Sequence, residues 1–194
     1  MAYIGMRNPV AAPVSSHTDG SAITYGAGFV MGTAVEANIS FETNDNIDYG
    51  NDIPIDNDNG INGYSGTVDT NDLAPEVREK LLGWVKKTGT GSTVSHYSVT
   101  DDPAPEVGFG FVHVGMFRGV RYYDAYWYHK ARFTMANIRA MTKQRQIDWN
   151  HPQLSFTGLG AYIDGTGKAS YFDYMRFDTE AAANAWLNGR AGIT

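Results

Sequence analysis

The sequence predicts a mainly β protein with one helix against its sheet, a short second helix near the C-terminal end and a long hairpin arm. Three observations predict this class. From Thr33 to Glu42 the odd positions are mostly apolar and the even positions mostly polar or acidic, the alternation of a strand with one wet face. Residues 109–117 are apolar on both faces, which indicates a buried strand. One segment, opened by Asp72, carries a clear helical stripe.

Size and composition favour a single domain that spans residues 1–194. Of the 194 residues, 42% are hydrophobic and 13% aromatic, which suffices for a proper core. There is no cysteine, so disulfides and thiolate metal sites are excluded.

Residues 1–16 lack the charged start and apolar run of a secretory signal, and no apolar stretch approaches the roughly 20 residues that span a bilayer. We therefore expect synthesis in a cytoplasm and no membrane partner.

The first third of the chain is interpreted as an N-terminal arm followed by two strands joined by an acidic arm. Residues 1–25 form the expected N-terminal arm. The strand that ends at Glu42 presents its polar face through four residues, which are Glu36, Asn38, Ser40 and Glu42. Residues 43–62 are rich in Asn, Asp and Gly, as in a long exposed hairpin arm. Pairing is expected to resume near residues 63–69, with Tyr64 and Val68 toward the core.

A helix is predicted over residues 73–88. Asp72 is a suitable N-cap and Glu76 lies in the first turn. The apolar stripe comprises Val77, Leu81, Trp84 and Val85. Gly89 can supply the left-handed residue that ends the helix.

The second half of the chain returns to strands. A turn at Arg118-Gly119 separates the buried strand 109–117 from an aromatic strand. One face of the aromatic strand carries Tyr123, Ala125, Trp127, Ala131 and Phe133, and the other carries Tyr122, Asp124, Tyr126, Tyr128, Lys130 and Arg132. After a helix-tolerant region at 136–145, strands at 154–163 and 169–177 flank a hairpin turn at 164–167. A short helix, 179–187, is expected between an Asp178 cap and Gly189.

Charge is distributed unevenly along the chain. No lysine or arginine lies between Arg7 and Arg78, yet that stretch holds eleven acidic residues, whereas the other fourteen basic residues follow among ten acidic ones. Proteins that bind DNA normally meet its phosphates with Lys and Arg. The first half of the chain is therefore suited to avoiding adhesion to DNA, or simply to forming a solvated acidic surface.

Catalytic and metal-binding motifs do not fit this sequence. An EF-hand frame placed with Gly60 at its fixed glycine would begin at Ile55 and end at Gly66, neither of which has a ligating side chain. Ser65 lacks the second glycine of a nucleophile elbow, and the five histidines show no metal-ligand spacing. We therefore expect no enzyme activity, cofactor or metal. The exposed-aromatic pattern Tyr122, Tyr126 and Tyr128 could stack on a sugar, although packing is the better interpretation.

The order of several short motifs resembles the major tail tube proteins of long, flexible-tailed bacteriophages, specifically the phi13-type major tail protein family. The motifs run in this order: Asp72-Leu73-Ala74-Pro75-Glu76-Val77, Leu81-Leu82-Gly83-Trp84, Asp101-Asp102-Pro103-Ala104-Pro105, Val107-Gly108-Phe109-Gly110-Phe111, Arg121-Tyr122-Tyr123, Trp127 through Phe133, and Ala185-Trp186-Leu187. The match in order covers roughly residues 30–190. The Asn/Asp/Gly-heavy arm, the basic insert at 136–145 and the first 25 residues depart from it.

The resemblance implies a β-sandwich or barrel flanked by a helix, assembled into six-fold rings that stack into a hollow virion tail tube for DNA ejection. The implied lumen residues are Glu36, Asn38, Ser40 and Glu42. The arm would reach a neighbouring copy through Asp45, Asp48, Asp52, Asp56 and Asp58. The implied basic contacts of that neighbour are Lys86, Lys130, Arg132 and Arg139. Further implied partners are a tape-measure protein, other tail proteins and DNA that passes without specific binding.

Two other functions stay open at the level of sequence. A tail hub or terminator protein would share the fold within the same structural class. A glycan-binding β-sandwich would use the tyrosines of the aromatic strand for adhesion. The tube protein predicts concentration-dependent polymers, whereas the glycan-binding module predicts a monomer or small oligomer with an exposed aromatic patch.

Overall fold

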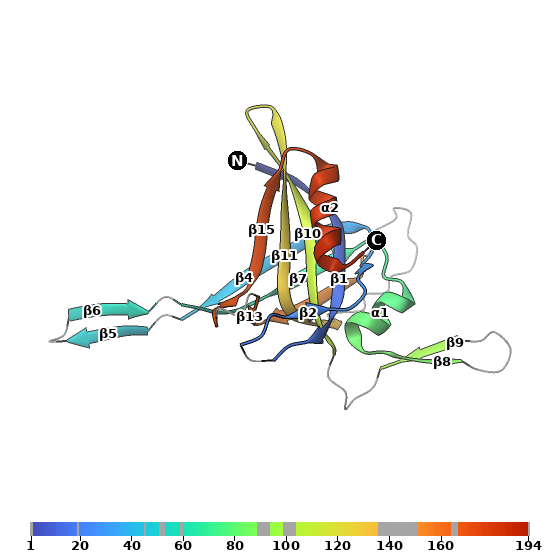
Figure 1. Cartoon of the computed structure of the whole chain (residues 1–194), viewed down its shortest axis with the longest axis horizontal. Helices are drawn as coiled ribbons and strands as arrows, with labels where there is room; N and C mark the ends of the chain where they lie inside the picture. Colours follow the sequence, from blue (N-terminus) through green and yellow to red (C-terminus); the bar gives the residue numbers. More distant parts are fainter. Residues whose placement is uncertain are drawn as a thin grey trace, which may run out of the picture.

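A computed structural model describes residues 2–18, 20–44, 46–50, 53–58, 60–88, 94–98, 104–135, 151–163 and 167–193. Over these residues the protein is mainly β with two helices, as predicted (Figure 1). The strands of the first half are β1 (Ala2–Ser16), β2 (Thr24–Tyr25), β3 (Phe29–Val30), β4 (Ala34–Thr43), β5 (Asn46–Gly50), β6 (Ile53–Asp58), β7 (Ile61–Thr70), β8 (Val85–Thr88) and β9 (Val94–Tyr97). Those of the second half are β10 (Glu106–Phe117), β11 (Val120–Met135), β12 (Gln153–Gly158), β13 (Ala161–Tyr162), β14 (Ala169–Ser170) and β15 (Phe172–Phe177). The helices are α1 (Pro75–Leu82) and α2 (Glu180–Ala191).

The main sheet is antiparallel and, within the described residues, has nine strands. Its order is β2-β1-β10-β11-β12-β7-β4, with β3 on β1 and β15 on β11. The sheet curls, so that β4, β7 and β12 face β10 and β11 across a hydrophobic core, while α2 covers the opposite side of β1, β10 and β11 (Figure 1). The result is a barrel-like β-sandwich with flanking helices, in agreement with the predicted fold class.

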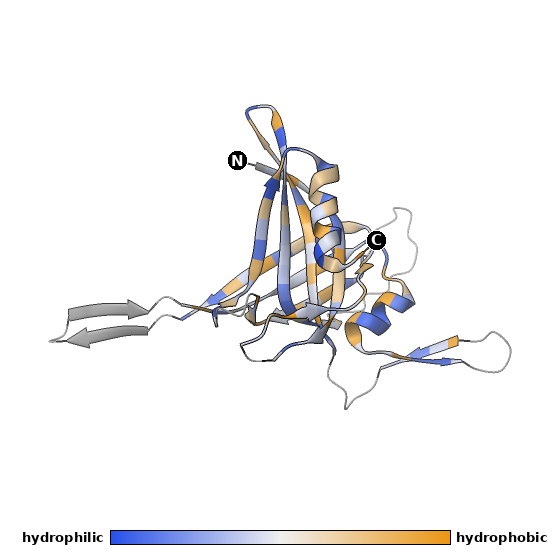
Figure 2. Cartoon of the chain, viewed as in Figure 1, coloured by the Kyte–Doolittle hydropathy of each residue, from blue (hydrophilic) through white to orange (hydrophobic). Residues whose placement is uncertain are grey.

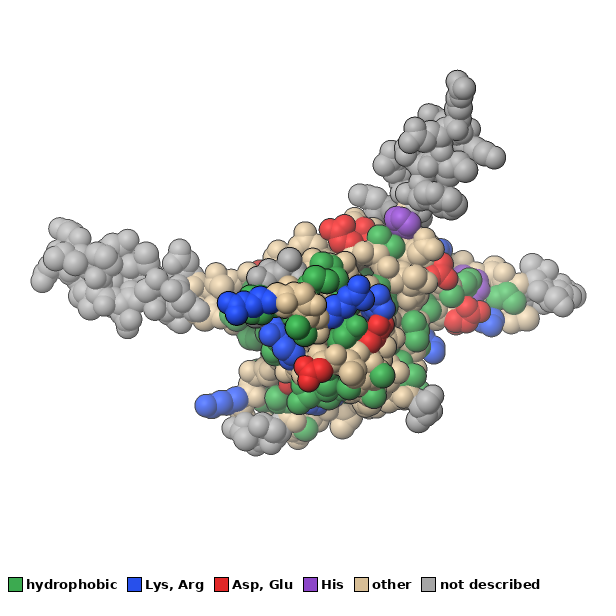
Figure 3. Space-filling view, turned by 90° about the horizontal axis from the view of Figure 1, so that it is seen from above, with side chains coloured by type: hydrophobic (Ala, Val, Ile, Leu, Met, Phe, Trp, Pro, Cys, Tyr) green, Lys and Arg blue, Asp and Glu red, His purple; other side chains and the backbone are tan. Residues whose placement is uncertain are grey.

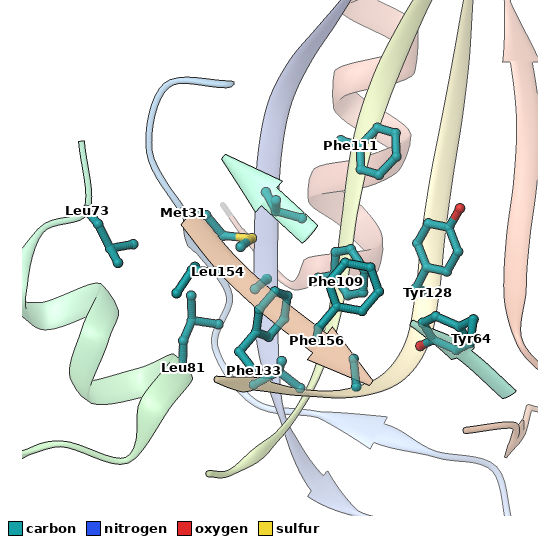
Figure 4. Close-up of a cluster of buried hydrophobic side chains, with 14 residues drawn as sticks. Met31, Tyr64, Leu73, Leu81, Phe109, Phe111, Tyr128, Phe133, Leu154 and Phe156 are labelled. Carbon is teal, nitrogen blue, oxygen red and sulfur yellow. The ribbon is translucent and has the colours of Figure 1, made fainter. Parts of the chain in front are cut away.

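Aromatic rings fill the core between the two halves of the sheet. Phe109 of β10, Phe133 of β11 and Phe156 of β12 are each at most 2% exposed and contact one another at ring-centroid distances of 4.8 to 5.5 Å (Figure 4). A second core lies under α2, where Leu187 packs near Trp127. Figure 2 shows hydrophobic residues along the central strands β1 and β10. Large buried side chains of this kind each contribute about 1.5–3 kcal/mol of burial free energy.

A bulge in β11 is what allows the sheet to curl. Val107 of β10 lies opposite Ala131, but Phe109 lies opposite Tyr128, so β11 has one additional residue at His129–Lys130. At this point β11 exchanges its partner: residues 123–128 pair with β15 and residues 131–135 pair with β12. Bulges bend a strand and increase its twist. Each bulge carbonyl is satisfied, since Tyr25 Oη donates to His129 O (2.9 Å) and Tyr64 Oη to Lys130 O (2.8 Å).

Because of the bulge, the faces predicted for the aromatic strand are partly wrong. Before the bulge, Tyr128 points into the aromatic core, and after it Ala131 and Phe133 point into the same core. Strict alternation over residues 122–133, which placed Tyr128 and Phe133 on opposite faces, is therefore wrong. The additional residue shifts the alternation by one position.

The N-terminal segment is part of the sheet rather than an arm. Residues 2–16 form β1, which pairs with β10 and, further along, with β2 and β3. Val10, Ala11 and Ala12 are fully buried. The sequence shows no alternation here because residues 9–12 are buried on both faces, and because two register shifts and a left-handed Asn8 (φ 49°) interrupt the strand.

Both helices differ in extent from their predictions. The helix α1 ends at Leu82, because Gly83 takes a left-handed conformation (φ 70°) and its N–H bonds to Glu79 O. Residues 85–88, expected at its C-terminal end, form β8. The side chain of Asp72 is not the N-cap; it accepts a hydrogen bond from Thr33 N (3.3 Å).

The C-terminal helix is longer than predicted. It begins after Thr179, whose hydroxyl caps Ala182 N (3.4 Å), and it ends at the left-handed Gly192. Gly189 lies inside the helix. The predicted strands 154–163 and 169–177 are each divided in two, and the β13–β14 pair preserves the predicted hairpin between them.

Buried tyrosines predict loss of stability in alkali. Burial raises the pKa of Tyr25, Tyr64 and Tyr128 above the ordinary value of 10.0. The folded state thus retains protons that the unfolded chain loses above pH 10, so the stabilisation is complete below that pH and declines above it, by up to about 1.4 kcal/mol per tyrosine per pH unit. We expect the urea midpoint to fall steeply between pH 9.5 and pH 11. An unchanged midpoint over this interval would contradict the proposed burial of the three hydroxyls.

Candidate functional site

The outer surface of β4, β7, β12 and the second half of β11 forms a continuous face, here called the polar face. Strand register defines three rows of residues that lie opposite one another on adjacent strands. The rows are Ser40–Ser65–Thr157–Arg132–Glu106, then Asn38–Thr67–Ser155–Thr134, and Glu36–Asp69–Gln153. Residues that pair directly in an antiparallel sheet point to the same side. The rows therefore align into one polar surface.

The reverse side of the same strands is hydrophobic, which fixes the direction of the polar face. Ala37, Val68 and Leu154 lie opposite one another on β4, β7 and β12. All three belong to, or pack against, the aromatic core. A one-residue slip in register would exchange the two faces, so burial of these residues specifies which side faces outward.

The predicted lumen residues all lie on the polar face. Glu36, Asn38, Ser40 and Glu42 are exposed along β4. The alternation in the sequence thus predicted which side of β4 is exposed. The role of that side as a lumen wall stays a prediction. The alternation did not identify the polar residues of β7 and β12 that continue the face, because their positions depend on pairing between distant segments.

The charge of the polar face is mainly acidic, with two cations at its far side. The predicted basic contacts Lys130 and Arg132 lie there and share one carboxylate: Arg132 Nη2 is 3.0 Å and Lys130 Nζ 3.9 Å from Glu106 Oε1. With Thr157 and Leu159 they line an open hollow of about 320 Å³. These two bases therefore lie on the same face as the predicted lumen residues but are separated from β4 by the strands β7 and β12.

The strand β4 is the free edge of this face. Among the described residues it pairs with β7 alone, on one side. Its ten residues include no Lys, Arg, Pro or Gly, although edge strands are commonly protected by charge, proline or bulges. Its pairing with β7 is irregular at both ends, at Val35 and between Glu42 and Thr43, and its charged residues are Glu36 and Glu42. Within the described residues no second strand is hydrogen-bonded to β4, although β1 passes near it.

The acidic arm extends from this edge as a hairpin. The strands β5 and β6 continue β4 and β7, and Asn44 N donates to Gly60 O (2.7 Å) at its base. Figure 1 shows the hairpin extending away from the sheet. Asp48, Asp56 and Asp58 lie in its strands. Asp45 and Asp52 lie outside the described residues.

The remaining predicted basic contacts are not brought together with Lys130 and Arg132. Lys86 lies in β8, in a second projecting hairpin, where its register partner is His96. Arg139 and the rest of the 136–145 region lie outside the described residues. The four predicted bases thus do not form a single cluster over the part of the chain that the structure describes.

The proposed sugar-stacking tyrosines are mostly buried. Tyr122 is 7% and Tyr128 4% exposed, and Tyr126 is half-buried. Tyr128 stacks on Phe109 in the core (5.0 Å), and Arg176 covers the ring of Tyr122 (4.2 Å). The packing interpretation is correct for these two rings, and Tyr126 is the one of the three tyrosines that stays partly exposed.

A buried carboxylate that the sequence analysis did not single out lies on the same strand. Asp124 is 0% exposed and accepts four hydrogen bonds: from Arg176 Nε (2.7 Å), Arg176 Nη2 (2.9 Å), Tyr174 Oη (3.1 Å) and Tyr3 Oη (3.2 Å). The carboxylate in turn raises the pKa of Arg176. An acidic residue within an aromatic strand was the available signal. The cluster joins β1, β11 and β15 and is structural.

A second buried polar group lies at the bulge. His129 is 1% exposed, and its Nε2 is 3.4 Å from Asp173 Oδ1; Arg190 Nη2 is 2.9 Å from Asp173 Oδ2. His129 and then Arg190 lower the pKa of Asp173. These contacts connect the sheet to α2.

The end of the molecule formed by the β10–β11 turn exposes hydrophobic and basic side chains together (Figure 3). Phe117 is 48% and Val120 68% exposed, and the left-handed Arg118 lies between them in the turn. With Tyr122 and Arg176 they line a shallow hollow of about 290 Å³.

Over the described residues, no three His, Cys, Asp or Glu side chains are close enough to hold a metal ion. No helix in the same part of the chain has the length and apolar character to cross a membrane. No protein-family model matches the sequence, and no curated protein matches it significantly. The resemblance to tail tube proteins stays a prediction.

Proposed function

We propose that this chain is a structural virion protein that self-assembles into stacked six-fold rings, which form the hollow tail tube through which phage DNA is ejected. The observation that carries this proposal is the polar face, a broad surface across four strands that ends at β4, a strand that pairs on one side only within the described residues. Tape-measure and other tail proteins would be its partners, and the virion its final location. The protein would act without catalysis.

The composition of the polar face suits a wall past which DNA slides. Its strands β4 and β7 contain Glu36, Glu42 and Asp69 and no Lys or Arg. Most other residues of the face are Ser, Thr, Asn or Gln, and the cations Lys130 and Arg132 already share Glu106. A wall whose cations are few and lie beside a carboxylate offers phosphates few ion pairs. Repulsion from its acids acts within about 8 Å at physiological salt, so the wall must lie close to the duplex.

The open edge of β4 suits the joining of subunits within a ring. A sheet edge presents unpaired N–H and C=O groups that pair readily with another strand. When every copy contributes its edge to the next copy, the sheets close into a continuous barrel and no edge stays exposed. The polar face would then line the inside of that barrel.

Within the same class, a tail hub or terminator protein would use the same edge but stop at one ring. The length of the polymers distinguishes the two roles. The glycan-binding alternative is less favoured, because two of its three tyrosines, Tyr122 and Tyr128, are buried and Tyr126 is half-buried.

A cysteine introduced on the polar face tests its location. The chain has no cysteine, so Ser40→Cys would carry a single thiol, and Asp178→Cys, an exposed position beside α2, is the matched control. We expect a small maleimide to label Ser40→Cys both in the monomer and in assembled tubes. A bulky polyethylene glycol maleimide should label Ser40→Cys only in the monomer. Equal labelling of Ser40→Cys by the bulky reagent in tubes would place the face on the exterior.

A further inference from the structure

Two hairpins project from the body of the protein in opposite directions along its longest axis (Figure 1). One is formed by β5 and β6, and the other by β8 and β9. In both cases the two strands pair only with each other within the described residues. An isolated two-stranded hairpin is marginally stable in water, so each would gain stability from a partner surface.

The β5–β6 hairpin belongs to an acidic segment without compensating charge. Residues 43–62 contain five aspartates and no lysine or arginine. The register places Asp48 opposite Asp56, and Asp58 opposite Asn46. A cationic partner surface would complement the negative charge of this segment.

The β8–β9 hairpin offers a cationic and partly apolar surface. Lys86 and Lys87 are exposed, and the described residues provide no carboxylate partner for either of them. Beside them, Val85 and Tyr97 lie opposite each other and are 37% and 48% exposed. The hairpin lies beside α1, where His96 Nδ1 is 2.9 Å from Glu79 Oε1.

We propose that the β5–β6 hairpin of one copy docks on the β8–β9 hairpin of a second copy. The inference rests on the proposed self-assembly and names the surfaces that meet. It follows from opposite charge and from the placement of the two hairpins at opposite ends of the molecule. Two different surfaces of one chain meet in such a contact, so it repeats from copy to copy and builds rings or filaments.

Two other basic surfaces fit the acidic hairpin less well. Lys130 and Arg132 already share Glu106. Arg118 lies at the β10–β11 turn, away from the long axis along which the two hairpins project (Figure 1). Both surfaces serve as comparison positions in the test.

Disulfide formation between single-cysteine variants tests the contact, since the chain has no cysteine of its own. Asp56→Cys is mixed in turn with a size-tagged Lys87→Cys, Arg118→Cys or Arg132→Cys, allowed to assemble and oxidised. We expect the mixed disulfide dimer to form with Lys87→Cys several-fold more than with either comparison variant. Preferential cross-linking to Arg118→Cys or Arg132→Cys, or none with Lys87→Cys in assembled protein, would overturn the proposal.

Charge reversal provides the second measurement. Lys86→Glu combined with Lys87→Glu should remove polymers at concentrations where the unaltered chain forms them, and adding Asp48→Lys and Asp56→Lys should restore them. Normal polymers from the Lys86→Glu/Lys87→Glu variant would contradict the docking but leave the tube proposal intact. If the unaltered chain does not assemble at any concentration, the tube proposal and the docking both fail.

Discussion

Deleting residues 45–59 is expected to leave the subunit folded and to abolish its polymerisation. Within the described residues, the strands β5 and β6 of this segment pair only with each other and not with the main sheet. The deletion joins Asn44 to Gly60, and these two residues follow and precede the paired Thr43 and Ile61. Asn-Gly is a favoured two-residue hairpin loop, so β4 and β7 can stay paired. Circular dichroism and thermal unfolding test the fold, and electron microscopy tests assembly.

The matched control for this deletion keeps the arm and removes its charge. Replacing Asp48, Asp56 and Asp58 with Asn preserves the length of the hairpin. If charge drives the contact, this variant also loses polymers, whereas a contact through shape alone would keep them. Normal tubes from the deletion variant would show that the arm is dispensable for assembly.

Asp124→Ala is expected to lower the free energy of unfolding by about 3 kcal/mol, the low end of the loss that follows removal of one partner of a buried ion pair. The carboxylate is fully buried, and its four hydrogen bonds tie Tyr3 of β1 and two side chains of β15 to β11. The loss stays at the low end because Tyr3, Tyr174 and Arg176 retain access to water. Urea unfolding measures the change.

Two further variants separate the ion pair from general effects of mutation. Asp178→Ala removes an exposed acid two residues after Arg176 and should change stability by at most about 0.5 kcal/mol. Asp124→Leu combined with Arg176→Met replaces both partners by apolar groups and should recover part of the loss, since it leaves no unpaired charge. A loss of less than about 1 kcal/mol in Asp124→Ala, within the range of an ordinary hydrogen bond, would contradict the structural role assigned to this cluster.

The sequence predicted the elements that depend on local pattern. The alternation in residues 33–42 predicted β4 and its exposed face, and the turn signal at Arg118-Gly119 predicted the β10–β11 connection. The end of α1 was missed because the apolar stripe continues through Val85, although Gly83 ends the helix by its left-handed conformation. The additional residue at His129–Lys130 was missed because a bulge is visible only against a partner strand.

The candidate site was predictable only at its edge. Glu36, Asn38, Ser40 and Glu42 share a face within one strand, so periodicity alone placed them together. Thr67, Ser155 and Thr134 continue that face, but they come from segments far apart in the chain. Their alignment depends on register between β7, β12 and β11, which is fixed by burial of the opposite side.

Electron microscopy of the purified protein over a concentration series tests the central proposal most directly. The account predicts hollow tubes or stacked rings that become more numerous with concentration, with β4, β7 and β12 facing the bore. A single particle size, corresponding to a monomer or small oligomer up to the highest soluble concentration, would contradict the proposal that this chain builds a tube.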